Sequence, residues 1–268
     1  MNWNFISLKM NAHILFDLTR YFLICSLLTQ SFEMLKIAKV LQSTTHPWNW
    51  KNIKTDFEIF PIFIKMFFDK IYSNSFENVI YIQLATCFFL LFFLSPYLIL
   101  VLISTTLLIC LRFRGVFNGG SDYMTMTVLL GLLISSIITS SIDFGLIYIA
   151  IQSMLSYFIA GIVKLKNPQW RNGLALKTFL KYSNYFIPNF IKTNSENKKI
   201  ILFNTWLVIF WEFTFPLALL NIKLLTLYLI IGFFFHITNF ISFGLNRFIW
   251  AWLASYPALF YIHLKLVH

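Results

Sequence analysis

A lysine at the end of a long apolar run has the sequence context of a possible base. Lys164 follows Ser153, Tyr157, Ala160 and Gly161 at spacings that place all five on one face of an α-helix. Three of these residues are small, so the face leaves room beside the ammonium group for a neighbouring helix or a ligand. A lysine that is partly removed from water can act as a base. The pattern therefore predicts proton-transfer chemistry next to Lys164.

A simpler interpretation of Lys164 is also open. A lysine at the end of a membrane helix commonly extends its ammonium group to the aqueous boundary and only anchors the helix. Lys166, two positions later on a different face, could be such an anchor by itself.

Three polar residues interrupt the later apolar runs. Glu212 lies within one run, and His236 and Asn239 lie three positions apart in the next. Ionisable groups at membrane depth are costly, so Glu212 must be neutral, paired or facing a cavity. The alternative for each residue is a structural hydrogen bond between helices, worth about 0.6 kcal/mol. No second histidine lies one turn from His236, so we expect no metal or haem site there.

A turn-forming segment, "NGGSD", separates two apolar runs. Gly119 and Gly120 permit positive φ or a close backbone approach, and Ser121 or Asp122 would be a good N-cap for the next helix. Exposed amides at that helix start could bind an anion or a polar head group, with Asn118 beside them. The alternative is an ordinary capped turn.

The composition indicates which solvent surrounds these residues. Of 268 residues, 59% are hydrophobic and 12% are charged, whereas a soluble domain has roughly 25% charged residues. The net charge of +11 comes from Lys and Arg that lie mainly between apolar runs, where they suit lipid head groups better than nucleic acid. The three cysteines lie inside apolar runs, so no disulfide framework is expected. We predict an all-α membrane protein with one transmembrane domain over residues 1–268.

The apolar runs predict a bundle of about eight transmembrane helices. A span needs about 20 apolar residues, and residues 79–111 as one helix would be about 50 Å long, so we divide that run at Pro96. Residues 57–70 and 174–192 are predicted to lie on the membrane surface as amphipathic segments. The predicted spans are residues 14–35, 79–94, 97–111, 123–139, 146–163, 200–221, 224–242 and 248–264.

The charges predict an orientation for this bundle. Eight spans place 17 of the 21 Lys and Arg in loops on one side and three on the other. Because positively charged loops face the cytoplasm, both termini are predicted outside it. Trp250, Trp252 and Tyr256 are predicted to be aromatic residues of the membrane interface.

Taken together, these clusters resemble one family, the HTTM proteins. The resemblance runs over nearly the whole chain, and its most specific parts are "YFIAGIVKL" (157–165), followed by Trp170, and "FHITNFISFGLNRFIWAWLASYPALF" (235–260). The best-known member is the vitamin K-dependent gamma-glutamyl carboxylase, whose first motif carries a lysine regarded as the base that activates vitamin K hydroquinone. The resemblance implies that Lys164 is this base and that His236 matches a histidine of a later helix.

Two differences from the carboxylase limit what the resemblance implies. "NGGSD" has no histidine where the carboxylase has one, and nothing here resembles the carboxylase's large lumenal domain. These differences argue against gamma-carboxylation of protein glutamates. The segment is more similar to stand-alone bacterial members, including membrane proteins that help to mature sporulation-delaying-type peptide toxins.

The resemblance therefore implies a multi-pass protein of the bacterial inner membrane that binds a quinone or another lipid-soluble cofactor. Its substrate would be a secreted peptide or a small molecule. Lys164 and His236 would be catalytic, and the cofactor would contact Asn118, Gly119, Gly120, Asp122, Tyr157 and Asn239. The alternative is a non-enzymatic membrane factor for the maturation, export or immunity of a secreted peptide toxin.

Overall fold

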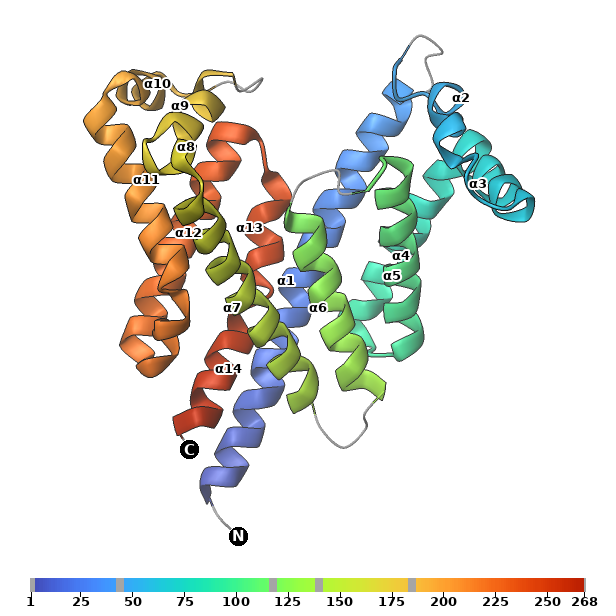
Figure 1. The fold of residues 1–268 in the computed structure, drawn as a ribbon. Coiled ribbons are helices and arrows are strands. Elements are labelled where there is room, and N and C mark those ends of the chain that lie inside the picture. The colour runs from blue at the N-terminus through green and yellow to red at the C-terminus, as the bar shows by residue number, and fades with distance from the viewer. Residues whose placement is uncertain (1–2, 42–45, 116–119, 138–141, 183–186, 268) are drawn as a thin grey trace.

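The computed structural model of the chain is a bundle of helices (Figure 1). It describes residues 3–41, 46–115, 120–137, 142–182 and 187–267, and every regular element within these ranges is helical, as predicted. The elements are α1 (Trp3–Leu41), α2 (Trp50–Ile53), η1 (Lys54–Phe57), α3 (Ile62–Asn74), α4 (Phe76–Phe92), α5 (Pro96–Arg112), α6 (Gly120–Ile137), α7 (Asp143–Lys166), α8 (Pro168–Arg171), α9 (Leu174–Lys181), α10 (Asn189–Glu196), α11 (Lys198–Phe213), η2 (Phe215–Leu220), α12 (Ile222–Phe243), α13 (Asn246–Leu253) and α14 (Tyr256–Val267).

Within the described ranges, four helices are long and apolar enough to cross a membrane: the Ala12–Leu41 part of α1, α6, α7 and α12. A fifth span results if α3 and α4 count as one bent helix, with an angle of 79° between the two parts. The predicted number of eight is not confirmed. Helices α4 and α5 have 17 residues each, at the lower limit of the about 17–25 residues of a span, and α11 with 16 residues is just below it.

Prolines set several of the helix boundaries. The predicted break at Pro96 is confirmed, because α4 ends at Phe92 and Pro96 opens α5. The predicted spans 200–221 and 248–264 are each interrupted, near Pro216 and Pro257 respectively. Proline lacks the amide hydrogen and its ring clashes with the preceding turn, so an α-helix rarely continues through it.

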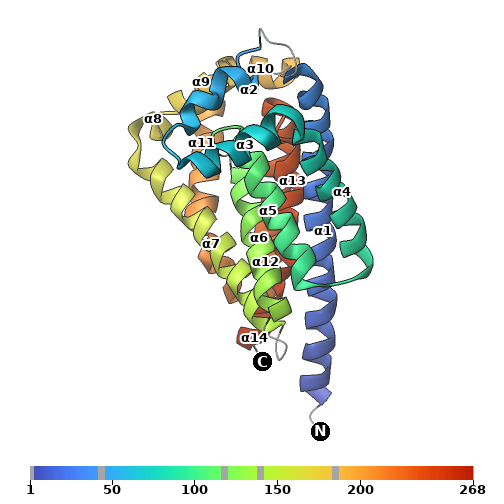
Figure 2. The same cartoon turned by 90° about the vertical axis from the view of Figure 1, so that its right-hand side faces the viewer.

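The termini and the surface helices lie at opposite ends of the bundle. The ends marked N and C lie together, and α2, α3, α8, α9 and α10 lie at the other end (Figures 1 and 2). Helix α3 exposes Ile62, Phe63 and Met66 by 73%, 69% and 69%, as an amphipathic helix at a membrane surface would. The described surface helices and the termini therefore lie at opposite ends of the bundle, and the orientation across a membrane stays a prediction.

Two long helices organise the packing. Helix α1 contacts α4, α6, α13 and α14, and α7 contacts α6, α11 and α14. Helix α13 contacts both α6 and α12, so α6, α7, α11, α12 and α13 come together around the residues that the sequence singles out.

Candidate functional site: a cavity beside Lys164

Helices α7 and α11 approach each other closely at Gly161. A Cβ atom at this position would lie 2.4 Å from the backbone nitrogen of Phe213 and 2.7 Å from its Cα. Only glycine allows this separation, because any side chain would meet the α11 backbone. One turn later on α7 is Lys164, and Glu212 directly precedes Phe213. The close approach therefore brings the predicted base opposite the predicted buried carboxyl group.

Lys164 and Glu212 form an ion pair. The Lys164 Nζ donates to both carboxylate oxygens, at 2.8 Å from Oε1 and 2.6 Å from Oε2. The side chains are 16% and 4% exposed, so solvent screens the pair little. The ring of Trp170 lies 5.2 Å from the same Nζ. Lys164 therefore binds a buried carboxylate instead of extending into solvent, unlike a simple anchor.

A second polar contact joins α7 to α12. The Tyr157 hydroxyl lies 2.8 Å from His236 Nε2, and both residues are 2% exposed. Trp252 stacks on the His236 ring at 5.0 Å, and the Tyr256 hydroxyl lies 3.4 Å from that of Tyr157. The prediction that Trp252 and Tyr256 lie at the membrane interface is wrong. They are only 8% and 7% exposed because they pack around Tyr157 and His236.

A cavity of about 580 Å³ lies beside both contacts, and we call it the Lys164 cavity. It is lined by residues of α6, α7, α11, α12 and α13, with apolar and aromatic side chains such as Phe235 and Phe248 among them. The volume is within the range of about 300–1,000 Å³ that small-molecule sites occupy. An apolar space with a few convergent polar groups suits a ligand that is itself largely apolar.

Two buried nitrogen atoms in the lining have no partner within the described part of the chain. They are His236 Nδ1 and Trp252 Nε1. More than about 90% of buried polar groups in proteins are hydrogen-bonded, whether to protein, water or ligand. His236 and Trp252 therefore each keep an unbonded polar atom next to the Lys164 cavity.

The cavity gathers most of the predicted site residues. Five of the eight line it: Gly120, Tyr157, Lys164, His236 and Asn239. Asn118 and Gly119 lie outside the described residues. Asp122 does not line the cavity. The predicted N-cap role of Ser121 or Asp122 is wrong, because α6 begins at Gly120 and includes both in its first turn.

Asp122 belongs instead to a buried polar group that we call the Arg247 cluster. Arg247 is 1% exposed, donates to Asp122, and has its Nε 3.1 Å from Glu33 Oε2. Gln30 donates to Asp122 at 3.1 Å, and Gln83 donates to Gln30 at 2.9 Å. The cluster thus links α1, α4, α6 and α13.

The sequence patterns did not predict this cluster, because Arg247 falls between the predicted spans 224–242 and 248–264 and so in a positively charged loop. The structure corrects this, because two carboxylates compensate the guanidinium charge inside the bundle. A signal was present in the first apolar run, where Gln30 and Glu33 lie about one helical turn apart. Nothing in the sequence identified their partners.

Over the residues that the structure describes, the fold defines a class, an all-helical protein with four helices long and apolar enough to span a membrane. These features are compatible with a multi-pass membrane protein. In comparisons with known proteins, no family profile, curated protein or solved structure matches the chain.

Proposed function

We propose that this chain is an HTTM-type protein of the bacterial inner membrane that binds a quinone-like, lipid-soluble molecule in the Lys164 cavity. In this proposal the bound molecule serves the modification of a peptide or a small substrate, with Lys164 and His236 as the catalytic residues. The observation that carries the proposal is the convergence of Lys164, Tyr157, His236 and Asn239 on one largely apolar cavity.

The cavity lining fits such a ligand. A quinone head group has a flat apolar ring, which aromatic residues such as Phe235, Phe248 and Trp252 can contact. Its oxygen atoms could bond to the unpartnered nitrogens of His236 and Trp252. Asn239 offers a further donor from the same helix as His236.

The ion pair supplies a route for a proton. When bound, a quinone-like molecule would contribute redox chemistry and, in its reduced form, acidic hydroxyl groups. Lys164 already donates two hydrogen bonds to Glu212, so transfer of one proton along this contact leaves a neutral amine. That amine could then take a proton from a molecule in the cavity, while Glu212 holds the first one.

The Tyr157–His236 contact would orient the bound molecule. The hydroxyl of Tyr157 fixes one nitrogen of the imidazole at 2.8 Å and leaves Nδ1 for the ligand. Stacking on Trp252 holds the ring plane. The imidazole is thus held in one orientation beside the cavity before a ligand binds.

The proposal includes about eight membrane crossings. Helices α4 and α5 would cross at about 25 Å each, near the lower limit, and α11 with η2 and α13 with α14 would cross as interrupted spans. In a background without Cys25, Cys87 and Cys110, cysteines placed at Asn52 and Asn194 should be shielded from an impermeant thiol reagent in intact cells. A cysteine at Val267 should react, and the opposite pattern would contradict the orientation.

The cofactor proposal is tested by mass spectrometry of lipid extracts from the purified protein. The wild-type protein should carry a quinone. Ala160→Phe, which fills the cavity from α7, should lose it. Val163→Phe is the matched control, because Val163 is 57% exposed on the same helix and does not line the cavity.

The same experiment separates the two function classes. A quinone that is equally abundant with Ala160→Phe and Val163→Phe would contradict binding in the Lys164 cavity. A wild-type extract without quinone, together with a co-purifying secreted peptide, would favour the non-enzymatic maturation, export or immunity factor.

A further inference from the structure

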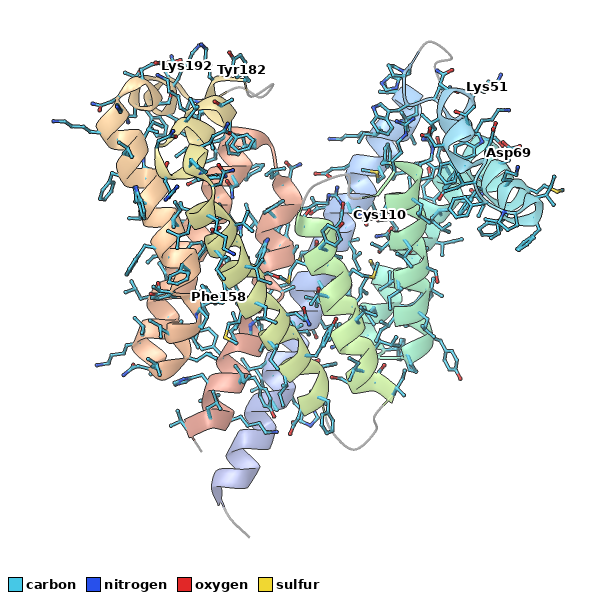
Figure 3. The ribbon with its side chains drawn as sticks, viewed as in Figure 1. Lys51, Asp69, Cys110, Phe158, Tyr182 and Lys192 are labelled. Carbon is cyan, nitrogen blue, oxygen red and sulfur yellow. The ribbon has the colours of Figure 1, made fainter. Side chains whose placement is uncertain are left out.

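A second cavity, of about 370 Å³, lies where α2, α3, α4 and α5 meet, and we call it the Arg112 cavity. It is separate from the Lys164 cavity and belongs to the end of the molecule where Figure 3 labels Lys51 and Asp69. Its polar lining includes Asn49, Lys51, Tyr72, Ser73, Glu77 and Arg112.

Arg112 is buried here with donors to spare. The residue is 2% exposed, and its Nη2 donates to the Trp48 carbonyl at 2.8 Å. Its Nε and Nη1 are buried and have no hydrogen-bond partner among the residues that the structure describes. A buried donor that bonds to nothing is costly, and more so when it carries charge.

The surroundings of Arg112 also leave its charge without a counter-ion. The rings of Trp50, Tyr72 and Phe76 lie 5.7, 5.9 and 5.8 Å from its guanidinium carbon. These ring faces attract a cation but are poor substitutes for an anionic oxygen as hydrogen-bond acceptors. Within the described part of the chain, no carboxylate lies at ion-pair distance from Arg112. Arg247, by contrast, lies at ion-pair distance from two carboxylates.

We propose that the Arg112 cavity binds an anionic phosphate group through the free donors of Arg112. Guanidinium groups suit phosphate because several donors meet several oxygens at once. Lys51 adds a second positive charge to the lining and Glu77 one negative charge, so the lining retains one net positive charge. The proposal stands whether or not the Lys164 cavity binds a quinone.

The phosphate could belong to a phospholipid head group or to a free ion. Helix α3 borders the cavity and exposes Ile62, Phe63 and Met66 on its apolar side, which is how a helix at the membrane surface meets acyl chains. Head-group phosphates lie at that same level of the bilayer. A free phosphate would reach the cavity from the aqueous side instead.

The test uses the full chain, purified and delipidated in a nonionic detergent. Native mass spectrometry measures binding of phosphatidylglycerol, with diacylglycerol of the same acyl chains as the ligand that lacks phosphate. Thermal unfolding with inorganic phosphate, against sodium chloride at equal ionic strength, measures binding of the free ion. Arg112→Gln is compared with Arg114→Gln, since Arg114 lies two residues away, is half exposed and pairs with Asp56.

Phosphatidylglycerol should bind to the wild-type protein and to Arg114→Gln, and bind about tenfold or more weakly to Arg112→Gln. Diacylglycerol should not bind at this site. Stabilisation by inorganic phosphate that is lost with Arg112→Gln would assign the site to a free ion. If Arg112→Gln does not fold, Arg112→Lys is used instead. This variant keeps the charge but loses the guanidinium donors, and it should bind the same ligand more weakly. A wild-type protein that binds neither ligand, or an unchanged affinity in a folded Arg112 variant, would overturn the proposal.

Discussion

The Lys164 cavity and the Arg247 cluster are two buried polar regions of one bundle, and they differ in what surrounds them. In the Arg247 cluster, the guanidinium meets Asp122 and Glu33, and Gln30 and Gln83 continue the network between helices. Beside Lys164, one carboxylate pairs with one ammonium at the edge of a 580 Å³ cavity, and two residues of its lining have nitrogens that are unpartnered in the described part of the chain.

The comparison teaches that depth alone does not identify a functional residue. Both regions contain charged residues in apolar surroundings. The residues of the Arg247 cluster, however, do not line the Lys164 cavity, and their hydrogen bonds and ion pairs link four helices directly. Its most economical role is structural. The Lys164 region has a cavity, an ion pair and polar atoms that are unpartnered within the described residues, which are features of a ligand site.

The largest effect is expected from removal of Arg247. Arg247→Leu leaves Asp122 and Glu33 buried without their guanidinium partner, which should lower the free energy of unfolding by about 3–5 kcal/mol. Thermal unfolding in detergent measures the loss. Lys265→Ala is the control, because its pair with Asp143 is 40% and 36% exposed and should contribute at most about 1 kcal/mol. Equal effects of the two substitutions would contradict a structural role for the cluster.

Gly161→Ala should have the next largest effect. The new Cβ would lie 2.4 Å from the Phe213 nitrogen, so α7 and α11 must separate, at a cost of about 1–3 kcal/mol. The same movement should pull Lys164 away from Glu212. Gly120→Ala is the matched control, since its nearest neighbour would be a Phe248 side-chain carbon at 3.7 Å. Unchanged stability in Gly161→Ala would show that the two helices are not in this contact.

Substitutions of Glu212 test whether its carboxylate is paired with Lys164. Glu212→Leu leaves the Lys164 ammonium without an acceptor and should destabilise by about 1–3 kcal/mol, whereas Glu212→Gln keeps an acceptor and should cost less. The double variant Lys164→Met with Glu212→Leu should recover part of the loss, because neither charge is then left alone. Additive effects in this cycle would show that the two residues do not interact.

Tyr157→Phe should have the smallest effect on stability. It removes one hydroxyl, whose hydrogen bond to His236 is worth about 1 kcal/mol, and keeps the packed ring. It should nevertheless weaken binding of a quinone, since the His236 ring loses the contact that fixes it. Normal quinone content in lipid extracts of Tyr157→Phe would show that the Tyr157 hydroxyl does not contribute to quinone binding.

Much of the Lys164 cavity was predictable because its residues share local patterns. Tyr157, Gly161 and Lys164 lie on one face of one helix, and His236 and Asn239 lie one turn apart on another. The helical period therefore carries this information. The break at Pro96 was predictable for a similar reason, because proline acts on its own helix.

The rest depends on contacts between distant parts of the chain. Asp122 and Arg247 are 125 residues apart, and nothing local to either one specifies the other. The same applies to Trp252, whose burial against His236 follows from how α12 and α13 pack. Short and interrupted helices such as α4, α11 and α13 also made the number of spans harder to predict than the helices themselves.

The central claim, that the Lys164 cavity binds a ligand and the Arg247 cluster does not, is tested most directly by ligand-induced stabilisation. Thermal unfolding of the detergent-purified protein is measured with and without menadione, a small quinone. A ligand at 100 times its Kd stabilises by about 2.7 kcal/mol. We predict a menadione-dependent rise in Tm for the wild-type protein and for Arg247→Lys, and none for Ala160→Phe or Lys164→Met. No rise in the wild-type protein, or an equal rise in all four proteins, would contradict the account.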